Sequence, residues 1–237
     1  MSKRYGRWIW IIVIVLCVSL LVPVYLVLRK EYFLTGNSPR KFGATYMTMN
    51  NPFFHVVNDS IKEVVEGNGD FLIARDPAVD QEKQNEQIYE MIEEGVDAIF
   101  LNPVDWKAIK PALIACSEAG IPVFNVDTLV YDREYVVSVI ASDNYNAGVQ
   151  CAKDMMAKLD KADIVLLDQP IINSITQRMK GFTDTIAGND NYKVVVRRAA
   201  RGELEVAMEV MKEIIESGID FDVVIGGNDP TALGAVA

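Results

Sequence analysis

The sequence has very few of the side chains on which metal and nucleophile chemistry usually depends. It contains one histidine, His55, and three cysteines, Cys17, Cys116 and Cys151, which are neither even in number nor closely spaced. A histidine-rich metal site is therefore excluded, and the spacing supports neither a disulfide framework nor a zinc site. We expect a packing or surface role for His55 and small buried apolar roles for the cysteines. No nucleophile with its base can be named, so we predict neither an enzyme nor a cofactor.

Phosphate-binding motifs are also missing. Neither G-x-G-x-x-G after a strand nor G-x-x-x-x-G-K-[ST] occurs, and Gly67-Asn68-Gly69 precedes a strand and lacks the third glycine. The chain carries 33 acidic against 23 basic residues, a net charge of −10. Because binding to phosphates needs a basic surface, the acidity argues against nucleic acid, and we predict no nucleic-acid partner. The acidity indicates a well-solvated surface.

One long hydrophobic run stands near the start of the chain. Trp8 to Leu28 is 21 residues without a charge, with lysine and arginine on both sides. A helix of this length spans roughly 30 Å, the thickness of a bilayer core. The run is long for a signal peptide, no A-x-A cleavage pattern follows it, and no small residues precede Cys17 as they would a lipid-attachment cysteine. We predict a cytoplasmic tip and uncleaved transmembrane signal anchor over residues 1–34. A long signal peptide and a buried core helix are the alternatives, and the flanking charges do not decide the orientation.

A polar linker, residues 35–40, leads into a regular alternation of strand and helix patterns. Short apolar runs stand at residues 42–49, 71–74, 97–101, 121–126, 136–140, 163–167, 193–197 and 222–226. Amphipathic stretches of helical period separate most of them. This order predicts an α/β fold with parallel sheets and helices on both faces. We place a boundary after Ala141, where Ser142 and Asp143 can cap a new helix, giving one lobe at residues 41–141 and a second at 142–237.

Polar clusters follow four of the predicted strands directly. They are Asn50-Asn51-Pro52-Phe53-Phe54, Asn102-Pro103, Asp127 and Gly226-Gly227-Asn228-Asp229. In parallel α/β sheets, ligands bind at the carboxyl ends of the strands, where such side chains can converge. Amides and carboxylates exchange hydrogen bonds with hydroxyl groups, and aromatic faces cover the C–H patches of a sugar ring. The mixture therefore favours a neutral, polyhydroxylated ligand.

These segments together resemble the type I periplasmic sugar-binding proteins, most closely the ribose-binding group, which are solute receptors of carbohydrate ABC transporters. The resemblance is carried by TMNNPFF (48–54), FLNPVD (100–105), GIPVFNVDT (120–128), VVSVIASDNYNAG (136–148), RMKGF (178–182) and GGNDPTALGA (226–235). It implies a two-lobed fold of two doubly wound parallel sheets. The family's second lobe continues beyond the last motif, so we expect this chain to be C-terminally truncated and its second lobe to be incomplete.

The resemblance also implies a ligand-binding set. Its members are Asn51, Phe53, Phe54, Asn102 and Asp127 from the first lobe and Arg178 and Asn228 from the second. The phenylalanines would stack on the sugar, the amides would bond hydroxyls, and Asp127 would accept two hydroxyl bonds. Structural alternatives remain: a turn for Asn51, a helix core face for Phe53 and Phe54, a strand terminator for Asn102, helix caps for Asp127 and Asn228, and a surface ion pair for Arg178.

Three positions depart from the ribose-binding pattern. Thr128 stands where those proteins carry an arginine, Met47 replaces a serine, and Gly202 falls near the place of an aromatic residue that would close the site. The resemblance therefore implies a sugar other than ribose, either larger or differently substituted.

Two functions fit the resemblance and the predicted anchor. One is a membrane-tethered, extracytoplasmic receptor that traps a monosaccharide by hinge closure and delivers it to an ABC permease. The other is a sensor subunit that signals to a membrane histidine kinase, which the missing lipid-attachment cysteine favours. Both place the binding domain outside a single-pass anchor in the cell membrane, at the cell surface or in the periplasm. A sugar-responsive repressor is excluded, because the membrane run occupies the place of its helix-turn-helix.

Overall fold

The computed structural model describes residues 21–23, 25 and 38–237 and divides the chain into two compact units, Met1–Arg40 and Lys41–Ala237. The predicted anchor, Trp8 to Leu28, lies outside the described residues except for its positions 21–23 and 25. Among the residues described, no helix has the length and apolarity that crossing a membrane requires. The fold is carried by the second unit, Lys41–Ala237.

Eight strands form two parallel sheets in this unit. The first sheet has the order β2-β1-β3-β4-β5 and the second sheet the order β7-β6-β8. The strands are β1 (Lys41–Thr45), β2 (Phe71–Arg75), β3 (Ala98–Leu101), β4 (Val123–Val126), β5 (Ser138–Ile140), β6 (Ala162–Asp168), β7 (Tyr192–Ala199) and β8 (Val223–Gly226). The predicted parallel α/β architecture is thus confirmed. The first run is shorter than predicted, because the Met47 N–H leaves the sheet and donates to the Asn102 side chain.

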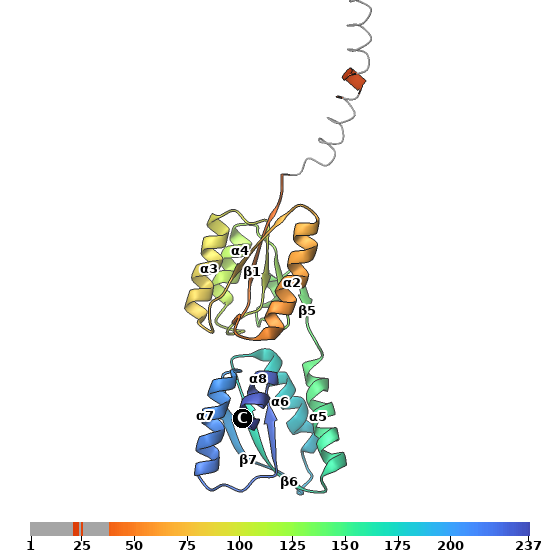
Figure 1. The fold of residues 1–237 in the computed structure, drawn as a ribbon, viewed down its shortest axis with the longest axis vertical. Helices are drawn as coiled ribbons and strands as arrows, with labels where there is room; N and C mark the ends of the chain where they lie inside the picture. Colours follow the sequence, from red (N-terminus) through yellow and green to blue (C-terminus); the bar gives the residue numbers. More distant parts are fainter. Residues whose placement is uncertain (1–20, 24, 26–37) are drawn as a thin grey trace, which may run out of the picture. The chain divides into compact units, whose positions relative to one another are not determined.

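Helices cover both faces of each sheet (Figure 1). They are α2 (Pro52–Gly67), α3 (Gln81–Glu93), α4 (Lys110–Glu118), α5 (Asn144–Lys158), α6 (Asn173–Ile186), α7 (Leu204–Glu216) and α8 (Asp229–Val236), with a 3-10 turn η1 (Arg133–Tyr135) before β5. Beside the first sheet, α3 packs on α4, and α2 contacts β2 from the other face. Beside the second sheet, α5 pairs with α6 and α7 pairs with α8.

Four of these helices begin at a polar residue whose side chain accepts a hydrogen bond from the first turn. Asn51 caps α2, Asp80 caps α3, Asp143 caps α5 and Asn228 caps α8. Each acceptor satisfies one of the unpaired N–H groups at the helix start. The caps of α2 and α8 therefore fix the two loops that follow β1 and β8.

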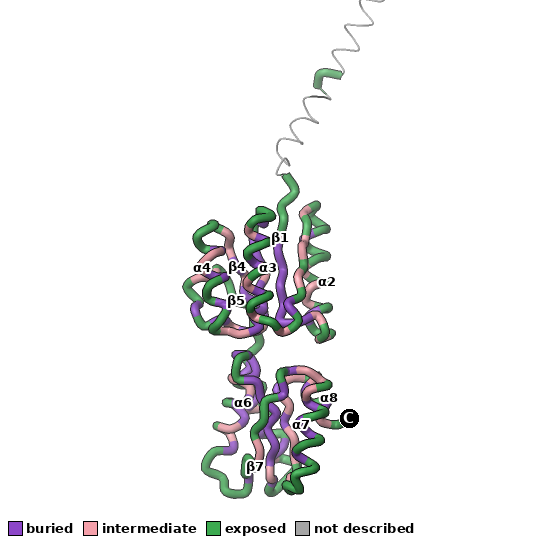
Figure 2. The backbone as a smooth tube through the Cα atoms, turned by 90° about the vertical axis from the view of Figure 1, so that its left-hand side faces the viewer, coloured by how far each residue is buried: buried purple, intermediate pink, exposed green. Residues whose placement is uncertain are grey.

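The buried residues follow the strands and the inward faces of the helices, as the tube in Figure 2 shows. Cys116 is buried, as expected, whereas the same expectation is wrong for Cys151, which is exposed. Cys17 lies outside the described residues. The chain passes once from the first sheet to the second, between β5 and β6, and the lobe boundary after Ala141 stays a prediction.

Two glycines bring α5 and α6 into backbone contact. A Cβ on Gly148 would come within 1.9 Å of the Arg178 carbonyl oxygen, and a Cβ on Gly181 within 1.9 Å of the Tyr145 carbonyl oxygen. Only glycine fits at this distance, since the obstacle is backbone and cannot rotate away. The close approach fixes where α6 presents Arg178.

We predict that Gly181→Ala lowers the free energy of unfolding by about 1–3 kcal/mol or more, because overpacking must push two helices apart. Urea unfolding of the full chain measures the change. Gly67→Ala is the matched control: its Cβ would meet nothing within 4 Å, so alanine in this helix should be neutral or stabilising by about 0.5–1 kcal/mol. Equal stability of both variants would contradict the packing argument.

Candidate functional site

A cleft of about 210 Å³ lies between the carboxyl ends of the two sheets. Its lining includes six of the seven predicted site residues, namely Asn51, Phe53, Phe54, Asp127, Arg178 and Asn228. The remaining one, Asn102, is not on the cleft surface. Met47, Thr128, Ser142, Ile172, Ser174, Ile175, Asp229 and Pro230 complete the lining. The structure thus brings together groups from five separate parts of the sequence.

The two adjacent phenylalanines at the start of α2 have different environments. Phe54 is 2% exposed and stacks on Tyr46 with ring centroids 5.6 Å apart, so it belongs to the core as well as to the cleft wall. Phe53 is 49% exposed and meets Phe54 edge-on at 5.2 Å. The core-face alternative therefore describes Phe54, whereas Phe53 keeps a ring face available to a ligand.

Asp127 presents a half-buried carboxylate to the cleft. Its backbone has a left-handed φ of 63°, held by an N–H bond of 2.7 Å to the Ile140 carbonyl. Oδ2 accepts hydrogen bonds from Asn102 Nδ2 at 3.2 Å and Thr128 Oγ1 at 3.1 Å. No group among residues 38–237 donates to Oδ1, which leaves this oxygen for a ligand.

Burial governs the charge of this carboxyl group. Desolvation raises the pKa of Asp127 above its usual value of 3.8, while the hydrogen bonds from Thr128 and Asn102 and the charge of Arg178 oppose the rise. A carboxylate that has already lost much of its water gains strongly from hydroxyl donors. The site is therefore suited to a ligand that donates hydrogen bonds.

Asn102 supports the cleft without lining it. Its side chain is fully buried, donates to the Val126 carbonyl at 3.1 Å as well as to Asp127, and accepts the Met47 N–H at 3.1 Å. These bonds tie the ends of β1 and β4 together and orient Asp127. Asn102 thus positions other groups of the cleft. This role resembles the alternative of a strand terminator more than that of a direct ligand contact.

Gln84 of α3 belongs to the same buried hydrogen-bond network as Asn102. This fully buried side chain donates to the Asn102 carbonyl at 2.9 Å and to Thr45 Oγ1 at 3.2 Å, and it accepts the Val104 N–H at 2.9 Å. No local pattern points to this residue, because one glutamine among the many polar residues of α3 resembles a solvated position.

Arg178 and Asn228 approach the cleft from the second sheet. The Arg178 guanidinium donates to the Gly227 carbonyl and to Asn144 Oδ1, at 2.6 Å for the latter. Both acceptors are neutral oxygens, so the alternative of a surface ion pair does not describe Arg178. Asn228 accepts the Thr231 N–H at 3.0 Å and donates to the Gly202 carbonyl at 3.1 Å, so the cap alternative holds for its amide.

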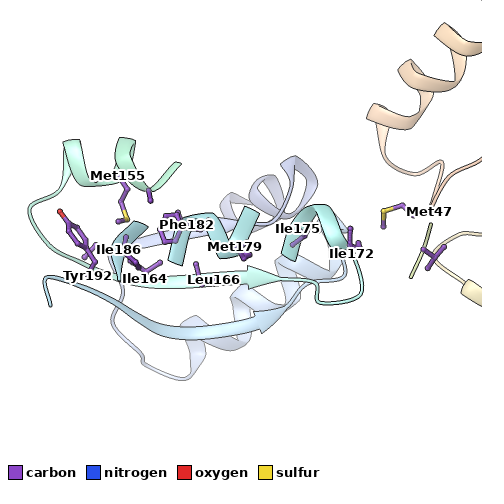
Figure 3. Packing of buried hydrophobic residues seen from close by; sticks show 14 of the residues in the cluster. Met47, Met155, Ile164, Leu166, Ile172, Ile175, Met179, Phe182, Ile186 and Tyr192 are labelled. Atoms are coloured by element: carbon purple, nitrogen blue, oxygen red, sulfur yellow. The ribbon is translucent and has the colours of Figure 1, made fainter. Parts of the chain in front are cut away.

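One side-chain hydrogen bond crosses the cleft floor between the two sheets. Thr128 Oγ1 lies 2.8 Å from Ser174 Oγ at the start of α6, and both residues are buried. Ser174 was not among the predicted residues, because a serine in the first turn of a helix has many ordinary roles. The cleft wall beside it is apolar: Figure 3 shows Met47 of the first-sheet side opposite Ile172 and Ile175.

Gly202 lies next to this site in a left-handed conformation, with φ 75°. A Cβ there would come within 3.1 Å of Asn228 Nδ2. It also borders a neighbouring pocket of about 220 Å³ that shares Asn51 and Pro230 with the cleft. The absence of a side chain at this position therefore leaves that edge of the cleft uncovered.

Several known proteins with similar sequences or folds are named as sugar-binding proteins. A family model described as "Periplasmic binding protein domain" matches residues 42–237. The ribose import binding protein of Bacillus subtilis is 30% identical over 196 residues, which are 82% of this chain and 63% of that protein. The D-apiose import binding protein of Paraburkholderia graminis is 31% identical over 191 residues, 79% of this chain and 61% of that protein.

Solved structures show the same fold. The periplasmic binding protein of the arabinose ABC transporter from Shewanella sp. ANA-3, bound to L-arabinofuranose, aligns with a TM-score of 0.76 and 28% identity. The alignment covers 83% of this chain and 67% of that chain. The chain spans somewhat less than two thirds of the length of the two curated relatives named above.

We predict that Asn102→Leu lowers the free energy of unfolding by about 1–3 kcal/mol, because it leaves the buried Met47 N–H and Val126 carbonyl without their partners. Urea unfolding of the full chain gives the value. Asn191→Leu makes the same change at an exposed position and should stay within about 0.5 kcal/mol of the parent. A loss no larger for Asn102→Leu than for Asn191→Leu would show that this network does not stabilise the strand ends.

Proposed function

The chain belongs to the periplasmic binding protein domain family, and from this premise we propose that it is an extracytoplasmic receptor for a neutral monosaccharide. The observation that carries the proposal is the free Oδ1 of the half-buried Asp127, which lies in one cleft with the exposed ring of Phe53 and the guanidinium of Arg178. A carboxylate oxygen accepts hydroxyl protons, an aromatic face covers a sugar's C–H surface, and arginine donates to ring or hydroxyl oxygens. All three recognise one polyhydroxylated ring.

The size of the cleft supports a small ligand. At about 210 Å³ it falls below the roughly 300–1,000 Å³ of sites for drug-sized molecules. The named relatives bind ribose, apiose and arabinofuranose according to their descriptions, all of which are single sugar rings. With Thr128 at a position where the ribose-binding group carries arginine, and glycine at residue 202, we propose a monosaccharide other than ribose.

We propose that the ligand is trapped by closure of two lobes, residues 41–141 and 142–237. In the described arrangement the Thr128–Ser174 hydrogen bond and a 3.1 Å bond from the Trp106 N–H to the Ile171 carbonyl join the two sides. Opening the cleft would break both bonds and expose Met47 and Ile172, which are buried here. A ligand that bonds both sides would add to this cost of opening and so shift the population to the closed form.

Delivery to an ABC permease is the proposed role of the closed form, with Trp8 to Leu28 as the membrane tether. The alternative, a sensor subunit for a histidine kinase, makes the same use of the cleft. Purification of the full chain from its native membrane separates the two, since a co-purifying permease supports transport and a co-purifying kinase supports sensing.

We predict that Asp127→Asn weakens binding of the best sugar about 10- to 100-fold. Asparagine also tolerates a left-handed backbone, so the change removes the charge-assisted hydrogen bonds, worth about 1.5–3 kcal/mol, with little change of shape. Calorimetric titration of the full chain with pentoses, hexoses and inositols identifies the best binder and measures the change. Asp154→Asn, on the exposed face of α5, is the matched control and should bind like the parent. Unchanged affinity in Asp127→Asn would overturn the assignment of this cleft.

The affinity should also depend on pH through the same residue. The carboxylate is the form that accepts hydroxyl protons, and burial raises the pKa of Asp127 above 3.8. Acidification therefore weakens binding, and the loss begins at a higher pH than an exposed aspartate would give. Titrations from pH 8 to pH 4 should show this fall in the parent and a flat profile in Asp127→Asn. A parent profile as flat as that of the variant would contradict the role of the charge.

A further inference from the structure

A second cavity of about 470 Å³ lies beside the cleft. Its walls come from the segments after β3, β4 and β5, from the first turn of α5 and from the first two turns of α6. Only Ser142 lines both this cavity and the cleft. The volume is within the range of roughly 300–1,000 Å³ typical of small-molecule sites.

One wall of the cavity is aromatic and firmly held. The rings of Trp106 and Tyr131 meet edge-on with centroids 5.5 Å apart, and Lys107 Nζ lies 4.9 Å from the Trp106 ring centre. The backbone is fixed on both sides: the Tyr131 N–H donates to the Trp106 carbonyl at 2.8 Å, and the Trp106 N–H donates to Ile171. Tyr145 at the start of α5 adds a third ring. Such rings can pack against the C–H face of a cyclic polyol.

The opposite wall carries an amide that has no partner in the protein. Asn173, the first residue of α6, is only 5% exposed and lines the cavity. Within the described part of the chain its side-chain amide has no hydrogen-bond partner. Because the residue lines the cavity, this amide is available to a water molecule or a ligand there. Gln177 lies one helical turn further on the same face and also lines the cavity.

The charges around the cavity favour a neutral ligand. Among the lining residues, Arg133 and Asp143 supply one charge of each sign, and Asp143 already accepts the Asn146 N–H as the cap of α5. Lys107 does not line the cavity, and its charge lies over the rings of Trp106 and Tyr131. We propose that this cavity is a second binding site, distinct from the Asp127 cleft, for a small uncharged polyol. In this site Asn173 and Gln177 bond the hydroxyl groups, and Trp106 and Tyr131 cover the carbon face.

The second site is connected to the first through Asn144. This residue lines the second cavity, and its Oδ1 accepts the hydrogen bond from Arg178, which lines the cleft. Both cavities are also walled by residues from each side of the crossing. A polyol in the second site therefore stabilises the arrangement in which the cleft is closed, and the coupling between the two sites is reciprocal.

Trp106 makes the proposal directly measurable, because the other two tryptophans are Trp8 and Trp10. The experiment uses the full chain with Trp8→Phe and Trp10→Phe, so that Trp106 is the only emitter, and with Asp127→Asn to weaken the cleft. Trp106 emission is followed during titration with myo-inositol and, separately, with inorganic phosphate. We expect a saturable change with inositol and none with phosphate.

In the same background, Asn173→Leu should weaken inositol binding about tenfold or more, which corresponds to the loss of one or two hydrogen bonds to the ligand. Asn191→Leu, the same substitution at an exposed position, should leave the titration unchanged. If Asn173→Leu does not fold, Gln177→Leu at a half-buried position gives the same readout with a smaller loss.

Three results would overturn the second site: no saturable change in Trp106 emission with inositol, a response to phosphate in its place, or equal inositol affinity in the parent and in the variant that folds. Because Asp127 is already replaced here, these results do not depend on the proposed receptor function. The receptor function is tested separately, by the calorimetric titration of Asp127→Asn.

Discussion

The buried side chain of Asn102 is the contact on which the cleft depends. Two strands, β1 and β4, end at the same edge of the first sheet, but parallel pairing alone does not fix the loops that leave them. Asn102 supplies the missing bonds, because its carbonyl oxygen holds the Met47 N–H and its amide holds Val126 and Asp127. An amide that both donates and accepts is the smallest group able to join these three points at once.

Asp127 is kept in a conformation that costs free energy. A left-handed backbone at a residue other than glycine costs about 1–3 kcal/mol, and burial of the carboxylate adds a desolvation cost. The bonds from Asn102 and Thr128 offset part of that cost in the free protein. A ligand that bonds the remaining oxygen offsets more of it, which relates the strain at Asp127 to the proposed affinity of the cleft.

The second sheet contributes through helix packing. Gly148 and Gly181 let α5 and α6 touch along their backbones, and this contact places Arg178 between Asn144 and the Gly227 carbonyl. Asn144 in turn borders the second cavity, so one short chain of contacts runs from that cavity to the cleft. The division of the chain between two sheets thus produces two cavities whose geometry depends on the same crossing.

The sequence by itself determined the parallel α/β fold and the eight strands, because strand and helix periods are local patterns. Five cleft residues, Asn51, Phe53, Phe54, Asp127 and Asn228, belong to polar clusters that directly follow predicted strands, whereas Arg178, inside α6, was predicted only from the resemblance to sugar-binding proteins. Whether Trp8 to Leu28 anchors the chain remains a prediction outside the described residues. Only the tertiary structure decided that Asn102 is buried beneath Asp127, that Gln84 braces it, that Phe54 is core while Phe53 is exposed, and that Thr128 meets Ser174. Those roles depend on which distant atoms come within hydrogen-bonding distance, and residue type and local spacing do not contain that information.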